Sequence, residues 1–273
     1  MLFESEIIER NHVQIIGQGE QTLVLAHGFG CDQNMWRYLV PFLTQEYKIV
    51  LFDYVGSGNS LKSAYNASKY SLLEGFAQDI IDICETLALQ NITLVGHSVS
   101  SIISSIAAVQ RPELFTNIVM ICPSPCFLND PPDYFGGFEK EDLQELMNLM
   151  DQNYLGWANY LAPLVMGTNN SEVLTQELAD SFCSTDPVIA KNFANATFFS
   201  DYRSLLPKIS LPVLLLQSQQ DTLASLAVGE YMQENIADCQ KVVVEAHGHC
   251  LHMTHPAIVA QHIEHYLRNN HLD

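Results

Sequence analysis

Basic side chains are scarce in this sequence. Its 273 residues include 12 lysines and arginines against 31 aspartates and glutamates, so the net charge at pH 7 is −19. The electric field of such a chain repels the phosphates of nucleic acids and the anionic headgroups of membranes. We therefore expect no nucleic acid and no membrane among its partners.

Long apolar runs are also missing. The apolar stretches are strand-length pieces such as LVLA and VLLL, whereas a membrane-spanning helix needs about 18 apolar residues. A secretory signal peptide needs a basic start followed by an apolar stretch, and this chain begins with Glu4, Glu6 and Glu9 instead. These features favour a protein of the cytoplasm.

The seven cysteines form no CxxC pair and are odd in number. This usage is typical of reduced thiols in a reducing compartment rather than of a disulfide framework. We expect most of them to be small residues of the core. The chain is long enough to bury a sizeable core, and one domain with an insertion is the simplest organisation.

Short apolar segments alternate with helical patterns through most of the chain. Segments at 12–16, 22–28, 48–54, 91–97, 117–122, 211–217 and 240–246 have the pattern of strands, and helical periodicity covers 71–89, the residues after 100 and 256–269. This alternation predicts a mostly parallel sheet flanked by helices on both faces. The predicted fold class is therefore α/β.

Residues 127–204 interrupt this alternation. They contain no convincing strand, but four helix-length segments that start near Glu139, Tyr154, Ser171 and Asp186. We therefore divide the chain into an α/β core, residues 1–126 and 205–273, and a helical lid insertion, residues 127–204. Ligands of open α/β sheets bind at the carboxyl ends of the strands, where such a lid would lie. The alternative is a second helical domain that does not act as a lid.

Ser98 stands between a predicted strand and a predicted helix, in the stretch LVGHSVS. A nucleophilic serine at such a junction sits on a sharp turn, so the residues two before and two after it must be small. Gly96 meets this requirement, and Ser100 stands where the motif usually has a second glycine. A serine that merely opens a helix is the alternative interpretation.

A nucleophilic serine also needs a base, an acid that orients the base, and donors for the oxyanion. Asp221 and His249 each follow a predicted strand, in the order serine, acid, histidine that α/β-hydrolases use. The loop HGFG, residues 27–30, offers the backbone N–H of Phe29, and Val99 offers a second N–H at the start of the helix. Each oxyanion donor lowers the barrier by about 3 kcal/mol.

Other residues near these strand ends allow competing interpretations. His247, His249, His252 and His255 lie close enough in the sequence to suggest a metal site, although we favour one of them as the base and the others as loop or helix caps. Asp53 ends a strand before Ser98, and we interpret it as a carboxylate that structures its loop. Cys31 and Cys250 flank the proposed oxyanion loop and base and are interpreted as small buried residues.

Aromatic residues are frequent in the insertion, among them Phe127, Phe138, Trp157, Phe198 and Phe199. Such residues are generally part of a core, but some must face the site if the insertion is a lid. We therefore expect a closed apolar cavity with few charges. A cavity of this kind suits a small hydrophobic substrate.

The assembled motifs resemble those of the RsbQ-like α/β-hydrolases, which act upstream of a stress sigma factor, and more distantly those of the plant karrikin and strigolactone receptors. The likeness spans residues 11–267 and is carried by HGFGCDQ, VLFDYVGSG, GHSVS, RPELF, PSPCFLNDPPDYFGGFE, FCSTDPVIA, FFSD and GHC followed by HMTHP. The resemblance implies an α/β-hydrolase fold with an inserted four-helix lid, and a PAS-domain protein phosphatase as a possible partner. It also implies the catalytic residues Ser98, Asp221 and His249, the oxyanion donors Phe29 and Val99, and substrate contacts by Phe29, Phe127, Phe138, Trp157 and Phe199.

The leading hypothesis is a serine hydrolase that cleaves a small hydrophobic ester, lactone or similar acyl compound as part of stress signalling. Its mechanism needs no metal and no organic cofactor. Two alternatives remain open: a metabolic carboxylesterase without a regulatory partner, and a ligand receptor in which turnover is incidental.

Overall fold

A seven-stranded sheet forms the centre of the molecule. The computed structural model describes residues 2–270, and the strand order is β1-β3-β2-β4-β5-β6-β7. Among the described strands, only β1 runs antiparallel to its neighbour, so the predicted mostly parallel sheet is confirmed. The strands are β1 Gln14–Ile16, β2 Gln21–Ala26, β3 Tyr47–Leu51, β4 Ile92–His97, β5 Phe115–Ile121, β6 Val213–Gln220 and β7 Cys239–His247.

Both faces of the sheet are buried, each in an apolar cluster of its own. Alternate residues of a strand point to opposite sides of the sheet and so join different clusters. In β2, Leu23 and Leu25 belong to one apolar cluster, whereas Val24 and Ala26 belong to the other. Residues of α2 (Val40–Leu43) and α11 (Pro256–Asn270) join the first cluster. The second cluster includes residues of α3 (Leu73–Thr86), α4 (Val99–Gln110) and α9 (Leu226–Asn235). Burial on both faces explains the continuous apolar strands of the sequence.

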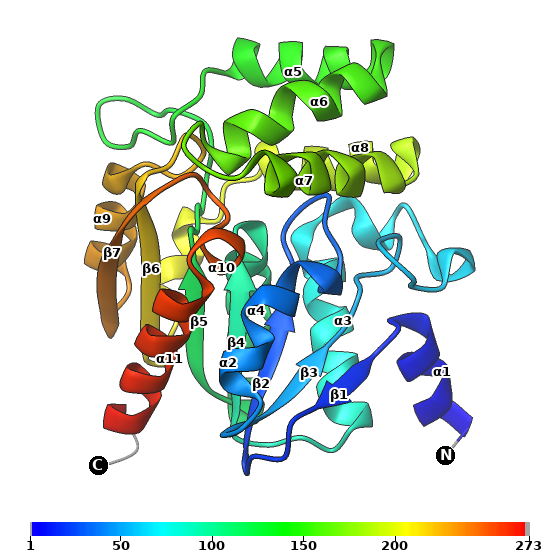
Figure 1. Ribbon diagram of the computed structural model, residues 1–273, viewed down its shortest axis with the longest axis vertical. Coiled ribbons are helices and arrows are strands. Elements are labelled where there is room, and N and C mark those ends of the chain that lie inside the picture. Colours follow the sequence, from blue (N-terminus) through cyan, green and yellow to red (C-terminus); the bar gives the residue numbers. More distant parts are fainter. Residues whose placement is uncertain (1, 271–273) are drawn as a thin grey trace.

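Four helices separate β5 from β6 in the chain and lie above the end of the sheet to which the parallel strands point (Figure 1). They are α5 Lys140–Gln152, α6 Tyr154–Met166, α7 Glu172–Ser184 and α8 Pro187–Phe198. Their N-caps are Glu139, Asn153, Ser171 and Asp186, so the predicted starting points are confirmed to within one residue. Residues 127–204 are all described and contain no strand. The division into core and lid domains stays a prediction.

Several elements lie outside the sequence prediction. Helices α1 (Leu2–Arg10), α2 and α9 were not among the predicted segments, and α10 (Leu251–Thr254) is a single turn. The strand predicted at 211–217 ends three residues too early, because β6 continues through Gln220, where it still pairs with β7. The 3-10 helices are η1 Gln33–Tyr38, η2 Lys62–Ala64, η3 Lys69–Ser71, η4 Pro112–Leu114 and η5 Arg203–Lys208. Within residues 2–270, no helix combines the length and apolar character needed to cross a bilayer.

Candidate active site

Ser98 occupies a strained turn between β4 and α4. Its backbone has φ 55° and ψ −127°, a region that residues with a Cβ atom rarely adopt and that is often retained at functional sites. The Ser98 N–H donates to the Ile121 carbonyl of β5 at 2.8 Å, which holds the turn against the sheet. A Cβ on Gly96 would lie 2.6 Å from the Ser101 nitrogen, so the small residue expected before the serine is required.

Three predicted site residues meet at the carboxyl ends of the strands. His249 Nε2 lies 2.7 Å from Ser98 Oγ, and His249 Nδ1 lies 2.7 Å from Asp221 Oδ2. A carboxylate can only accept, so Nδ1 carries the proton that it donates to Asp221, and Nε2 is left to accept the Ser98 proton. The structure thus brings together the serine, the imidazole and the carboxylate in the order that proton transfer from serine requires.

The environment of Asp221 keeps its carboxylate charged. Burial by itself would raise the pKa of Asp221, but the electrostatic interaction and hydrogen bond with His249 and the N–H groups of Leu223 and Ala224 outweigh it and lower the pKa. The two N–H groups donate to Asp221 Oδ1 at 2.8 and 3.1 Å. Asp221 therefore remains an anion that can stabilise a positive imidazole.

The loop that carries Phe29 is tied directly to the helix that follows Ser98. The buried Ser100 hydroxyl donates to the His27 carbonyl oxygen and lies 3.1 Å from the Tyr54 hydroxyl. A Cβ on Gly28 would lie 2.5 Å from the His97 ring, so only glycine permits this approach. Ser100, which departs from the usual motif, thus has a specific structural role.

Helix α4 begins at Val99, and the first N–H groups of a helix have no partner within the helix. Phe29 stands in the loop that Ser100 anchors against the same helix. Their roles as oxyanion donors stay a prediction.

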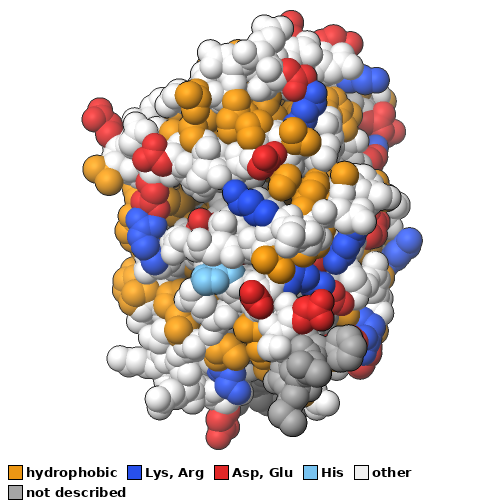
Figure 2. Space-filling view, turned by 90° about the vertical axis from the view of Figure 1, so that its right-hand side faces the viewer, with side chains coloured by type: hydrophobic (Ala, Val, Ile, Leu, Met, Phe, Trp, Pro, Cys, Tyr) orange, Lys and Arg blue, Asp and Glu red, His pale blue; other side chains and the backbone are white. Residues whose placement is uncertain are grey.

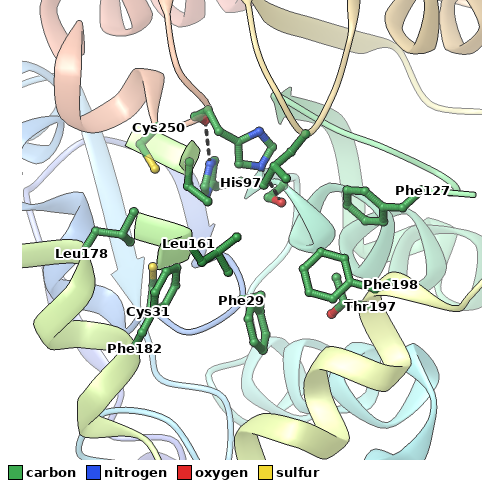
Figure 3. A pocket seen from close by; sticks show the side chains of 14 residues that line it. Phe29, Cys31, His97, Phe127, Leu161, Leu178, Phe182, Thr197, Phe198 and Cys250 are labelled. Atoms are coloured by element: carbon green, nitrogen blue, oxygen red, sulfur yellow. Dashed lines mark hydrogen bonds between the residues drawn. The ribbon is translucent and has the colours of Figure 1, made fainter. Parts of the chain in front are cut away.

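A small apolar cavity opens in front of Ser98 and His249. It offers about 30 Å³ of free space, room for about one or two water molecules. Figure 3 shows Phe29, Phe127 and Phe198 around this space, with Leu178 and Phe182 on the opposite side. The lining residues that the sequence analysis did not assign are Cys31, His97, Leu161, Val165, Leu178, Phe182, Thr197, Phe198, Leu223 and Cys250.

Three of the five aromatic residues predicted to contact substrate lie outside the lining of this cavity. Trp157 packs behind Phe29, with ring centres 6.0 Å apart. Phe138 lines a separate outer groove. Phe199, the residue after α8, lies beside Met147 and Lys191 in a surface depression, because one residue of helical rotation turns it away from Phe198.

The outer groove runs between α5, α6 and the loop after Asp221. It has a free volume of about 550 Å³ and shares Leu161, Phe198 and Leu223 with the inner cavity, so these side chains separate the two spaces. Asp142 and Glu145 are the charged residues of its lining, together with apolar and hydroxyl side chains. The charged side chains of the groove are therefore acidic.

Two thiols of the cavity wall are unsuited to act as nucleophiles. Cys31 and Cys250 are 5% and 1% exposed. Burial raises the pKa of Cys31 to about 12 and raises that of Cys250 well above its usual value. Both remain protonated at neutral pH, which agrees with their interpretation as small buried residues.

His249, His252 and His255 have different surroundings in the structure. His252 is fully buried between the rings of Trp36 and His97, and the carbonyl of His255 accepts the Val259 N–H in the first turn of α11. Among the described residues, Cys122, Asp221 and His249 form a group whose ligand atoms lie within 4.8 Å of one another. In the observed geometry the His249 ring is already bonded to Ser98 and Asp221.

Asp53 has the loop-structuring role that its position suggested. Its carboxylate is fully buried and accepts the N–H groups of Gln33 and Asn59 at 2.8 and 2.9 Å. It therefore joins the loop after β3 to the first residue of η1.

Comparisons with known proteins agree with this geometry. A family model described as the alpha/beta hydrolase fold matches residues 21–256. A Karrikin insensitive 2 receptor of Petunia hybrida is 42% identical, over 95% of this chain and 98% of the relative. A strigolactone esterase of Arabidopsis thaliana is 34% identical, over 94% and 96%. The structure of a hydrolase from Oleispira antarctica superimposes with a TM-score of 0.96 at 54% identity and covers 97% of both chains.

Proposed function

Because the chain belongs to the alpha/beta hydrolase family, we propose that it is a serine hydrolase that cleaves a small hydrophobic ester or lactone through an acyl-enzyme on Ser98. The observation that carries this proposal is the pair of 2.7 Å contacts that link Ser98 to His249 and His249 to Asp221. This arrangement removes a proton from the serine as it attacks.

In the proposed reaction, Ser98 Oγ adds to the acyl carbon while its proton moves to His249 Nε2. The N–H groups of Phe29 and Val99 stabilise the resulting oxyanion. Collapse of the tetrahedral intermediate expels the alcohol, which takes the proton from His249. Water then attacks the acyl-enzyme with His249 as base, which releases the acid and restores Ser98.

The substrate class follows from the shape and chemistry of the two spaces. The inner cavity is small and mainly apolar, so it suits a short apolar acyl group beside Ser98. The outer groove is larger and acidic, so it suits a neutral leaving group and disfavours an anionic one. Resemblance to a strigolactone esterase favours an ester or lactone as the reacting group.

We also propose that the protein has a regulatory role. The RsbQ-like motifs support a cytoplasmic hydrolase that supplies a signal to a PAS-domain phosphatase in stress sigma-factor activation, and the seven free cysteines suit a reducing compartment. Leu155, Tyr160, Leu164, Val173 and Val188 of the lid helices are large exposed apolar residues, and on the face drawn in Figure 2 hydrophobic side chains gather toward the lid end. Such surfaces commonly contact other proteins.

Similarity to a plant karrikin-insensitive receptor supports a second candidate, a ligand receptor with slow turnover. A fluorophosphonate probe tests the chemistry: Ser98 displaces fluoride from phosphorus and becomes covalently labelled. We expect stoichiometric labelling at Ser98 and none in Ser98→Ala. A wild-type protein that is neither labelled nor able to hydrolyse short acyl esters would contradict the hydrolase proposal. A signalling response in cells that persists in Ser98→Ala would favour the ligand-receptor function.

A further inference from the structure

The C-terminus of the lid helix α6 is bonded to both loops that carry Asp221 and His249. The last four carbonyl groups of an α-helix have no partner within the helix. In α6 the Pro163 carbonyl accepts the Gly167 N–H at 3.0 Å. The Leu164 carbonyl accepts from the Thr222 hydroxyl at 2.8 Å, and the Val165 carbonyl accepts from the His249 N–H at 2.8 Å. The Met166 carbonyl accepts from the Asn170 amide at 2.6 Å.

Asn170 also contacts the segment that carries the proposed base, residues 247–249, called the base loop below. The same Nδ2 group donates to the His247 carbonyl at 2.7 Å. Both partners of Nδ2 are carbonyl oxygens, so this end of the amide must be the nitrogen. Asn170 thus joins the end of α6 to the residue two before His249.

Two glycines allow this close approach. Gly248 has φ +88°, and a Cβ there would overlap the Met166 carbonyl. Gly167 has φ +82°, and a Cβ there would lie 2.9 Å from the Gly248 nitrogen. The Gly248 N–H in turn donates to the Gln220 carbonyl at 2.7 Å, so the base loop is also fixed to the end of β6.

We propose that Thr222 and Asn170 are positioning residues that make the alignment of His249 and Asp221 depend on the position of α6 against the two loops. This proposal rests on the proposed hydrolase function. The arrangement formed by the Leu164, Val165 and Met166 carbonyls with Thr222, His249 and Asn170 is called the α6 clasp below. When α6 moves away, the backbone of His249 loses its lid partner, and the 2.7 Å contacts of its ring lengthen. A displacement of about 1 Å is enough to reduce catalysis strongly.

The Thr222 arm can be tested with two substitutions of similar shape. Thr222→Val removes the hydroxyl donor and keeps the branched side chain, whereas Thr222→Ser keeps the donor. With a short neutral ester we expect Thr222→Val to lower kcat about 5- to 10-fold, as for the loss of one hydrogen bond, with KM within about 2-fold. Thr222→Ser should stay within about 2-fold of wild type.

The Asn170 arm has a matched control in its neighbour. Asn170→Ala removes both bonds, whereas Asn169→Ala removes an exposed amide that lies 3.5 Å from the His247 ring. We expect Asn170→Ala to slow fluorophosphonate labelling by about 10-fold and Asn169→Ala to leave it unchanged. The weaker His249–Asp221 contact should also lower the apparent pKa of the acid limb of kcat/KM, which a general loss of stability would not do.

Hydrogen exchange separates this proposal from the hydrolase proposal. The His249 amide should exchange faster in Thr222→Val and Asn170→Ala than in wild type or Asn169→Ala, whether or not the protein hydrolyses esters. If the wild-type protein is labelled and both clasp variants keep its labelling rate, pH profile and His249 exchange, the clasp proposal is wrong. If the wild type is not labelled, the hydrolase function fails, and the exchange result alone decides whether α6 fixes the base loop.

Discussion

Gly96 and Ser100 approach each other so closely that a Cβ on Gly96 would overlap the Ser100 carbonyl group. This contact brings the end of β4 against the first turn of α4, and Ser98 stands on the bend between them. The positive φ of Ser98 follows from the same tight connection. The geometry of the nucleophile therefore depends on a missing side chain two residues away.

Gly96→Ala should disturb this bend. The added methyl group must push α4 away from β4, and overpacking of this kind costs about 1–3 kcal/mol. We expect a lower melting temperature and at least about 10-fold slower fluorophosphonate labelling, because Ser98 moves relative to His249. Ser104→Ala is a suitable control in the same helix, since the buried Ser104 hydroxyl has no hydrogen-bond partner within the part of the chain that the structure describes. Normal labelling of Gly96→Ala would show that the bend tolerates a side chain.

The sequence was sufficient to locate Ser98, Asp221 and His249 because each follows a strand of a parallel sheet. The carboxyl ends of such strands meet at one edge, so residues far apart in the chain become neighbours. Ser171 and Asp186 were equally informative, since helix N-caps require side chains that accept a backbone N–H. In both cases a local rule fixed the position.

The lining of the cavity could not be predicted in the same way. Successive helical residues point about 100° apart, so a small rotation of α8 decides that Phe198 faces the cavity and Phe199 does not. That rotation is set by packing between helices. The bond from the His249 N–H to the Val165 carbonyl had no sequence signal at all, because it joins two backbone groups.

Buried histidines should make the protein sensitive to acid. Burial lowers the pKa of His97 to about 3, and the pKa values of His27 and His252 are also lowered, mainly by burial. The unfolded chain therefore binds protons that the folded chain does not, and the free energy of unfolding falls as pH drops below about 6.5.

The His97 shift corresponds to about 2 kcal/mol of stability lost between pH 6.5 and 4.5. Urea unfolding at several pH values measures this slope. Stability that stays constant from pH 7 to 4.5 would contradict neutral, buried histidines.

His252→Leu should stabilise the protein and flatten this pH dependence. Among the described residues, neither buried ring nitrogen of His252 has a hydrogen-bond partner. Replacing an unsatisfied polar group by an apolar one of similar size removes its desolvation cost of about 1–3 kcal/mol. We expect a larger gain at pH 5 than at pH 7, because the leucine cannot be protonated in the unfolded chain. His265→Leu, at an exposed position, should lack this effect. A destabilised His252→Leu protein would indicate that the ring has a polar partner.

Phe198→Ala should change the acyl specificity. The Phe198 ring separates the inner cavity from the outer groove, so its removal lets a longer acyl chain extend past it. The ratio of kcat/KM for hexanoyl esters to kcat/KM for acetyl esters should rise by about 10-fold, which corresponds to the burial of one or two methylene groups. The free energy of unfolding should fall by about 3–5 kcal/mol. Phe199→Ala is the matched control and should leave the ratio unchanged. An equal effect of the two variants would place Phe199 at the site after all.

The acidic groove should discriminate between substrates by charge. Asp142 and Glu145 line it, and Glu141 lies on the same helix outside that lining. An anionic leaving group entering the groove meets two like charges, each worth about 1 kcal/mol or less at an exposed site. We therefore expect Asp142→Asn combined with Glu145→Gln to raise kcat/KM for an anionic ester by about 5- to 10-fold at low salt. The value for a neutral ester of the same shape should be unchanged.

Glu141→Gln provides the control for the overall charge of α5, and added salt should reduce the difference between the two esters because it screens exposed charges. If Glu141→Gln acts as strongly as a groove substitution, the net charge of the protein governs entry rather than the groove. If the double variant does not distinguish the two esters at low salt, the leaving group does not pass Asp142 and Glu145, and a different route to Ser98 must be sought.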